Sequence, residues 1–167
     1  VELTHVPPAS IGALARRAKE LGARVVVVHG ETVVEPVEPG TNLAALQSPD
    51  VDILAHPGLI SLEELKLAAE NGKFIEISAR GGHCLANGHV VRLGRAVGVK
   101  FLVNSDAHGP HDLLTPGFAL KVALGAGLTE EDAHEVLVVN PKLFLERLGI
   151  PSNAHHKGPK TPRTGSV

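Results

Sequence analysis

Short apolar runs alternate with amphipathic segments along the chain, and this alternation constrains the fold more than any other feature. Four valines occupy positions 25–28, and further runs with strand character lie at 51–55, 74–78 and 101–103. Continuous apolar runs of this length are typical of strands buried on both faces, as in parallel sheets. Because helical periodicity separates the runs, repeated strand–helix units with right-handed crossovers are expected. The predicted fold class is therefore α/β. The architecture is either an open doubly wound sheet or a barrel, and the positions of the polar residues described below favour a barrel or a barrel-like sheet.

Capping and stop signals locate the helices between these strands. Ser10 is a candidate N-cap for a helix that Gly22 ends. Ser61 and Glu64 have the spacing of a capping box. Further helices are expected over 43–47, 89–97, 118–124, 130–138 and 141–148. Residues 151–167 lack apolar periodicity, so the sequence predicts one domain over 1–150 and a disordered tail over 151–167.

The composition disfavours several classes of protein. Lys and Arg number 16 against 18 Asp and Glu, and aromatic residues make up only 2% of the chain. The near-equal numbers of basic and acidic residues do not provide a basic surface for phosphates, and the few aromatic residues do not provide side chains on which bases can stack. Nucleic acid is therefore not an expected partner. No apolar run approaches the roughly 18 residues of a spanning helix, so no membrane association is expected. The single cysteine, Cys84, excludes an internal disulfide framework, which makes the cytoplasm the simplest location.

Residues that can bind metal ions lie at the ends of several predicted strands: Glu2, His29, His56, Asp106 and His108. The carboxyl ends of parallel strands gather at one face of the sheet, so these side chains are expected to converge. Asp106 and His108 are two residues apart, which on an extended backbone turns both to the same side. Imidazole and carboxylate ligands together suit Zn, Mn or Fe, and five of them are enough for two or more ions.

Three neighbouring polar residues are candidates for supporting the metal ligands. Asn104 and Ser105 directly precede Asp106 and are expected to orient the last two ligands. Glu31 follows His29 by two residues, and it either supports the metal ligands or caps its own loop.

Other residues are candidates for binding a substrate. Arg80 follows the strand at 74–78, where a guanidinium can hold a phosphate through two parallel hydrogen bonds. His83, in a glycine-rich loop, and His5 are further candidate substrate contacts. Cys84 is expected to be a small buried residue rather than a nucleophile, because no base partner is implied by the spacing.

The segments that carry these residues resemble the PHP domain, a family named for polymerase and histidinol phosphatase. The resemblance implies a distorted seven-stranded β/α barrel, here lacking its first strands, with a multinuclear site of two or three divalent ions. Glu2 matches the family's bridging carboxylate, His29 and His56 match its middle histidine ligands, and Asp106 and His108 match its final Asp-x-His pair. The opening His-x-His motif is missing, so the chain is expected to be the C-terminal portion of a longer protein.

The resemblance implies a metal-dependent phosphoesterase of the histidinol-phosphatase type, which hydrolyses a small phosphomonoester by a metal-activated hydroxide. Asp106, His108 and Arg80 are then the expected catalytic residues, and the expected partner is a small phosphorylated substrate. Three alternatives stay open: a non-catalytic structural domain of the same type, a nuclease-like activity on DNA ends, and a dinuclear amide hydrolase. The amide hydrolases usually carry a modified lysine at a strand end, and Lys66, Lys73 and Lys100 do not lie at the carboxyl ends of predicted strands.

Overall fold

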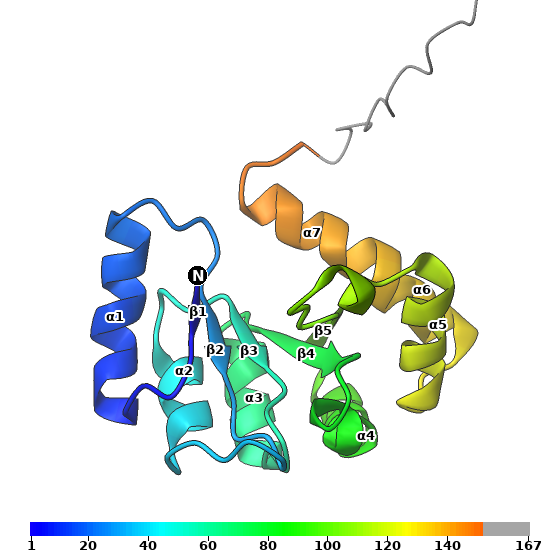
Figure 1. Ribbon diagram of the computed structural model, residues 1–167, viewed down its shortest axis with the longest axis horizontal. Coiled ribbons are helices and arrows are strands. Elements are labelled where there is room, and N and C mark those ends of the chain that lie inside the picture. The colour runs from blue at the N-terminus through cyan, green and yellow to red at the C-terminus, as the bar shows by residue number, and fades with distance from the viewer. Residues whose placement is uncertain (152–167) are drawn as a thin grey trace, which may run out of the picture.

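The computed structural model describes residues 1–151, so the tail expected over 151–167 lies outside the described residues apart from Pro151. One parallel sheet runs through the molecule, and its strands follow one another in the order of the sequence. Figure 1 shows the strands side by side, with the long β2–α2 loop at one end of the sheet and α7 at the other. The strands are β1 (Glu2–Leu3), β2 (Val27–His29), β3 (Ile53–Ala55), β4 (Phe74–Ser78) and β5 (Lys100–Asn104).

Helices connect the strands and extend the chain beyond the sheet. Helices α1 to α4 are the four crossovers between consecutive strands, and the remaining helices follow β5. The helices are α1 (Pro8–Glu20), α2 (Thr41–Gln47), α3 (Leu62–Glu70), α4 (Asn87–Val97), α5 (Pro116–Gly125), α6 (Glu130–His134) and α7 (Asn140–Arg147). Three shorter segments are the 3-10 turns η1 (His83–Ala86) and η2 (Pro110–Asp112) and the π-helical η3 (Glu135–Val139).

The strand order decides between the two architectures. Because each strand lies beside its predecessor and every step goes in the same direction, right-handed crossovers place α1 to α4 on one face of the sheet. Consecutive helices accordingly pack against each other, α1 on α2, α2 on α3 and α3 on α4. The sheet is thus singly wound, as in a β/α barrel, and the doubly wound alternative is wrong. Among the described residues the sheet has five strands with open edges at β1 and β5. This number fits a barrel that lacks its first strands, but the described residues do not form a closed barrel.

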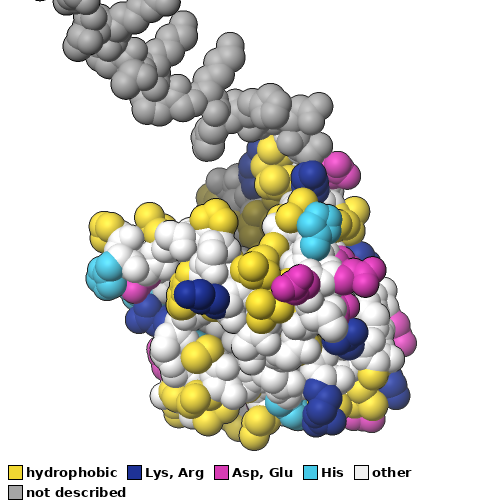
Figure 2. Space-filling view, turned by 90° about the vertical axis from the view of Figure 1, so that its right-hand side faces the viewer, with side chains coloured by type: hydrophobic (Ala, Val, Ile, Leu, Met, Phe, Trp, Pro, Cys, Tyr) yellow, Lys and Arg dark blue, Asp and Glu magenta, His cyan; other side chains and the backbone are white. Residues whose placement is uncertain are grey.

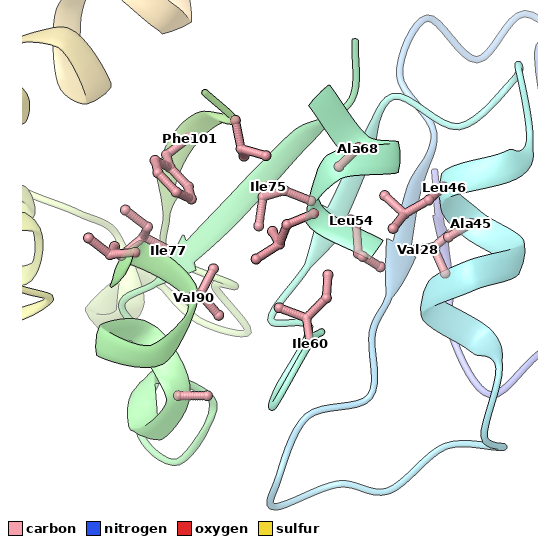
Figure 3. Packing of buried hydrophobic residues seen from close by; sticks show 14 of the residues in the cluster. Val28, Ala45, Leu46, Leu54, Ile60, Ala68, Ile75, Ile77, Val90 and Phe101 are labelled. Carbon is pink, nitrogen blue, oxygen red and sulfur yellow. The ribbon is translucent and has the colours of Figure 1, made fainter. Parts of the chain in front are cut away.

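The hydrophobic core lies between the sheet and α1 to α4. Figure 3 shows Val28, Leu54 and Ile75 from three adjacent strands facing side chains of the covering helices. All three side chains are at most 1% exposed. Burial of an aliphatic side chain of this size contributes about 1.5–3 kcal/mol. This core fixes the strands in register and therefore fixes where their carboxyl ends lie.

A smaller cluster covers the opposite face of the sheet near the amino ends of the strands. Ile53, Phe74 and Leu102 point to this face and pack against Phe144 of α7. The rings of Phe74 and Phe144 meet edge to face, with centroids 5.0 Å apart. Helix α7 therefore closes one end of this face, and the end formed by the carboxyl ends of the strands is left for polar side chains.

The structure shifts some predicted boundaries. The strand predicted at 25–28 is observed at Val27–His29, and that at 74–78 has the predicted bounds. The first helix begins at Pro8 and not at Ser10, because proline lacks the N–H that a first turn leaves unpaired and has a helical φ already set. Helix α4 begins at Asn87, whose side chain bonds both backbone groups of Ser78. None of the described helices combines the length and the apolar character needed to span a membrane.

Candidate metal centre

Three of the five expected ligands meet at one place. Glu2 from β1, His29 from β2 and His56 directly after β3 each offer a ligand atom, and these atoms lie within 4.8 Å of one another. Nδ1 of His29 is 3.0 Å from Nε2 of His56 and 3.8 Å from Oε1 of Glu2. Both imidazoles are buried, whereas Glu2 is partly open to solvent. Two imidazoles and one carboxylate form a donor set that catalytic zinc sites use.

A buried carboxylate that was not predicted from the sequence contacts the far side of the His56 ring. Glu76 of β4 is 4% exposed, and its Oε1 lies 3.2 Å from Nδ1 of His56. Its Oε2 accepts a hydrogen bond of 3.1 Å from Nδ2 of Asn104. Metal-binding histidines commonly donate their second ring N–H to a carboxylate, which orients the ring and raises its basicity. The signal in the sequence was a glutamate between two isoleucines in a buried strand, since such a carboxylate needs a partner.

The electrostatics of the three ligands favour a cation. Burial disfavours the charged form of His29, but the nearby carboxylates of Glu2 and Glu35 outweigh it, so the pKa of His29 is raised. The neighbouring His29 lowers the pKa of Glu2 despite partial burial. Nε2 of His29 is buried without a hydrogen-bond partner among the described residues. The donor types, their spacing and the carboxylate behind His56 all fit a divalent metal ion.

Asp106, the fourth expected ligand, lies on the rim of the same cavity. The cavity is an open pocket of about 270 Å³, and the polar residues that line it are Glu2, His56, Glu76, Asn104 and Asp106. Oδ2 of Asp106 is 3.8 Å from Nε2 of His83, whose ring centroid is 4.4 Å from that of His56. Burial and the neighbouring His56 lower the pKa of His83, so its neutral form is favoured. The structure thus brings His83, expected as a substrate contact, against the metal ligands.

His108, the fifth expected ligand, lies further out. Its side chain is 65% exposed, and Nδ1 bonds the backbone oxygen of Asp106 at 2.9 Å. The expectation that alternate residues point to one side requires an extended backbone, and Asp106 has φ +48° instead. His108 therefore does not join the group formed by Glu2, His29 and His56.

Arg80 reaches the same rim from the segment after β4. Its guanidinium donates a 3.1 Å hydrogen bond to the backbone oxygen of Asp106 and lies 3.5 Å from the Asp106 carboxylate. Asp112 is 3.9 Å from Arg80 and accepts the backbone N–H of His108. That hydrogen bond, reinforced by His111, lowers the pKa of Asp112. Arg80 is 31% exposed, so part of its side chain faces solvent beside Asp106.

Backbone strain is concentrated around these side chains. Among the described residues, the only non-glycine positions with positive φ are His5, His56 and Asp106, with φ of +53°, +31° and +48°. Left-handed backbone at such residues costs on the order of 1–3 kcal/mol each and persists where the surroundings enforce it. All three residues are in or beside the candidate centre, which is where strain is commonly found in functional sites.

The β2–α2 loop contributes two glutamates with different surroundings. Glu35 lies with Oε1 3.0 Å from Nε2 of His5 and Oε2 3.6 Å from Nε2 of His83. Glu31 turns away, because its Oε1 accepts the backbone N–H groups of Gly40 and Asn42 at 3.0 Å. Of the two alternatives for Glu31, the structure therefore shows the loop-capping one.

The remaining expected residues have distinct surroundings. Asn104 contacts Glu76 rather than Asp106, and Ser105 is half-buried next to Asp106. Cys84 is a free, half-buried thiol in η1.

The glycines after the two buried histidines are required by contact between loops. A Cβ on Gly30 would lie 2.5 Å from the backbone oxygen of Ala55, and one on Gly58 would lie 1.9 Å from that of Glu31. Gly58 also has φ +64°. The loops that follow β2 and β3 therefore touch through their backbones, which holds His29 and His56 side by side.

A larger hollow lies elsewhere. A groove of about 750 Å³ is lined mainly by apolar side chains of β5, α5 and η3, with Glu130 and His134 at its edge. Figure 2 views the side of the molecule that carries α5 and α6, where hydrophobic side chains interrupt the charged ones. The groove has no convergent set of donors, so the smaller cavity at the strand ends is the candidate site.

The fold and this cavity define a singly wound α/β protein with imidazole and carboxylate donors arranged as in a metal centre. No family model matches the chain. The chain belongs to the family of the uncharacterized protein MJ1295 of Methanocaldococcus jannaschii: the two are 53% identical over 148 residues, which is 89% of this chain and 68% of MJ1295.

Two further relatives carry functional names. A probable phosphatase of Thermoanaerobacter sp. (strain X514) is 40% identical over 101 residues, which is 52% of this chain and 40% of that protein. Ribonuclease P protein component 3 of Methanosarcina mazei is 30% identical over 165 residues, which is 88% of this chain and 65% of that protein. The chain therefore spans less than two thirds of both.

Two solved structures share the fold. A chain in the cryo-EM structure of archaeal ribonuclease P with mature tRNA matches with a TM-score of 0.71 and 16% identity, covering 100% of this chain and 76% of that one. An amidohydrolase crystal structure matches with a TM-score of 0.61 and 15% identity, covering 87% of this chain and 42% of that one. At these identities the likeness concerns the fold alone.

Proposed function

We propose that this protein is a metal-dependent hydrolase of the PHP type that cleaves a small phosphomonoester. The observation that carries the proposal is the group of Glu2, His29 and His56, backed by the buried Glu76. The probable phosphatases among the relatives support the same reaction class, although the chain spans only 40% of their length. The fold it shares with an amidohydrolase is compatible with a hydrolytic site at the strand ends.

Glu2, His29 and His56 would hold a divalent ion, and Zn, Mn and Fe suit their donor types. Such an ion supplies a Lewis acid that activates water and neutralises charge developing on the phosphoryl group. Glu76 accepts a hydrogen bond from Nδ1–H of His56, so the lone pair of Nε2 lies on the side of Glu2 and His29, where the ion would be held.

Arg80 and His108 take the roles nearest to the substrate. The contacts with Asp106 hold the guanidinium of Arg80 beside this carboxylate, which lines the cavity, and its remaining N–H groups would donate to phosphate oxygens. Nδ1–H of His108 donates to a backbone oxygen, so the imidazolium form of this exposed ring carries its second proton on Nε2 and would give it to the leaving alkoxide, becoming neutral imidazole. Asp106 is a catalytic residue because it orients Arg80 and His108 and offers its own carboxylate to the metal centre. His5, exposed beside Glu35, contacts the part of the substrate that protrudes from the cavity.

The test is a pair of variants, His56→Ala and Asp106→Ala, with His134→Ala on the exposed face of α6 as the control. Bound metal is measured by elemental analysis, and hydrolysis is measured on panels of phosphomonoesters and of amides. We expect both variants to lose metal and phosphatase activity together while the control keeps both. Unchanged turnover in the two variants would refute the assignment, and turnover of amides alone would reassign the reaction class.

A role with RNA is the second candidate, and the relationship to ribonuclease P protein component 3 favours it. On this hypothesis the chain is a non-catalytic protein that associates with an RNA or with a protein partner. Its balanced charge, with 16 basic against 18 acidic residues, predicts weak binding to RNA on its own. Filter binding to tRNA at low and high salt tests this: tight, salt-dependent binding that persists in His56→Ala would favour the RNA role over hydrolysis.

A further inference from the structure

A continuous row of polar contacts crosses the sheet from one edge to the other. Each strand, or the residue directly after it, contributes one side chain, in the order Glu2, His29, His56, Glu76 and Asn104. From β1 to β5 the distances between the contacting atoms of neighbours are 3.8, 3.0, 3.2 and 3.1 Å. The first three members are the candidate metal ligands, and Asn104 is the last member at the opposite end of the row.

Asn104 is anchored in β5, and its amide has one orientation toward Glu76. Strand β5 pairs with β4 along its whole length, with Ser78 opposite Asn104, and the backbone oxygen of Asn104 accepts the N–H of Ala79 at 2.9 Å. An ionised carboxylate only accepts hydrogen bonds, so the amide turns its donor, Nδ2, toward Oε2 of Glu76. The orientation of the amide is therefore fixed by its partner.

Glu76 depends on this contact because its carboxylate is buried. The two oxygens have different partners: Oε1 accepts from Nδ1 of His56, and Oε2 accepts from Nδ2 of Asn104. A buried charge is costly unless hydrogen bonds satisfy it. Without Asn104, Oε2 would lack a donor among the described residues. The carboxylate would then be free to turn about its last bond, which would move Oε1 away from His56.

We propose that Asn104 is a positioning residue of the metal centre, which acts on His56 through Glu76. By donating to Oε2 of Glu76, it holds Oε1 against Nδ1–H of His56, and this bond directs the Nε2 lone pair of His56 at the other candidate ligands. Spacing in the sequence assigned Asn104 to the ligands that follow it in the chain, whereas the structure connects it to a ligand two strands away. The inference rests on the proposed function, because it concerns the ion that the candidate ligands would hold.

The first experiment compares the zinc affinity of Asn104→Leu with that of the wild type. Leucine keeps the branched shape of the side chain but has no donor, so the affinity is expected to fall about tenfold, the lower end of the range for outer partners of metal-binding histidines. Affinities are measured on the full chain by competition against a fluorescent chelator, after subtraction of the zinc that a His29→Asn variant still binds. The matched control is Asn140→Leu, because Nδ2 of Asn140 donates to the backbone oxygen of Phe101 in the same strand β5, at 3.1 Å. This control should lower the free energy of unfolding but keep the zinc affinity.

Two further measurements separate positioning from a merely structural role. In a Glu76→Ala background, Asn104→Leu should change the zinc affinity less than about twofold, because a residue that acts through Glu76 has no further effect once that carboxylate is gone. In the metal-free protein, ¹⁵N NMR should show His56 as the Nδ1–H tautomer, and Asn104→Leu should give a mixture of the two tautomers. The tautomer decides the question if Glu76→Ala does not fold.

The outcomes distinguish this inference from the proposed function. The inference is overturned, and the proposed function stands, if the zinc affinity of Asn104→Leu stays within about twofold of wild type. An equal loss of affinity in Asn140→Leu, a full loss that recurs in the Glu76→Ala background, or an unchanged tautomer of His56 has the same consequence. A wild type that binds no zinc overturns the proposed function, and this inference with it.

Discussion

Replacing Glu76 by glutamine tests the part of the site that lies deepest. The Glu76 carboxylate accepts from two donors, Nδ1 of His56 at 3.2 Å and Nδ2 of Asn104 at 3.1 Å. Glutamine keeps the shape of the side chain but offers only one acceptor oxygen, and its amide nitrogen faces whichever donor the oxygen does not serve. One buried donor therefore loses its partner, at a cost of about 1–3 kcal/mol.

The metal affinity of Glu76→Gln should be lower than that of the wild type, because His56 loses the carboxylate that orients its ring and raises its basicity. Removing a carboxylate behind a metal-binding histidine typically weakens metal binding about 10–100-fold, which corresponds to about 1.4–2.8 kcal/mol. This range overlaps the cost of the unpaired donor, as expected if the same hydrogen bond is responsible for both. Without metal, the variant should be destabilised by the same order of magnitude.

The assay is a competition titration of Zn²⁺ against a fluorescent chelator, with denaturant unfolding of the metal-free protein alongside. Glu63→Gln, the same change at an exposed position of α3, is the control and should leave both quantities unchanged. A folded Glu76→Gln variant whose zinc affinity stays within about twofold of wild type would refute the reasoning, because the expected loss of affinity is about tenfold or more.

Three further predictions concern stability. Leu54→Ala removes a fully buried side chain from the central strand and should cost about 2–5 kcal/mol in denaturant unfolding, whereas Leu21→Ala, 71% exposed, should stay within about 0.5 kcal/mol; equal effects would contradict the core described above. Burial lowers the pKa of Lys73, so the unfolded state binds more protons than the folded state, and the free energy of unfolding should rise with pH up to the ordinary lysine pKa of about 10.4. Lys73→Met should flatten that rise. Parallel curves of unfolding free energy against pH for variant and wild type would contradict this role of Lys73. The pKa of Asp112 is lowered, so its contribution to stability should be complete above the ordinary aspartate pKa and should be lost as the pH falls through the lowered pKa. In acid titrations of stability, Asp112→Asn should lack this pH-dependent loss.

The sequence predicted the strands best where burial on both faces produced a continuous apolar run. Residues 74–78 form β4 with the predicted bounds, and the capping box of Ser61 and Glu64 starts α3 as predicted. The first helix was misplaced because prolines at positions 7 and 8 set its start more strongly than the side chain of Ser10. Local signals of this kind compete, and their relative strength depends on the packing of the segment that follows.

The site was predictable only in part because its geometry depends on non-local contacts. Topology explains why Glu2, His29 and His56 converge, since Glu2 and His29 belong to β1 and β2, His56 directly follows β3, and these strands are parallel neighbours. Glu76 was missed because a residue inside a strand can face either side of the sheet, and only tertiary structure tells which. Spacing misled for His108, because the left-handed backbone at Asp106 breaks the alternation that an extended segment would have.

The loss of folding stability caused by the strained backbone and buried titratable side chains of the candidate metal centre helps to decide between hydrolysis and a structural role. Three residues with left-handed backbone and four buried titratable side chains, His29, His56, Glu76 and His83, lie in or beside the candidate metal centre. Such strain costs about 1–3 kcal/mol per residue, and replacing buried ionic groups by apolar ones of similar volume is often neutral or stabilising. A scaffold that only bound an RNA or protein partner on its surface would gain stability from an apolar cavity. The stability that this arrangement sacrifices is therefore best explained by a bound cation, which offsets the cost only when it is present.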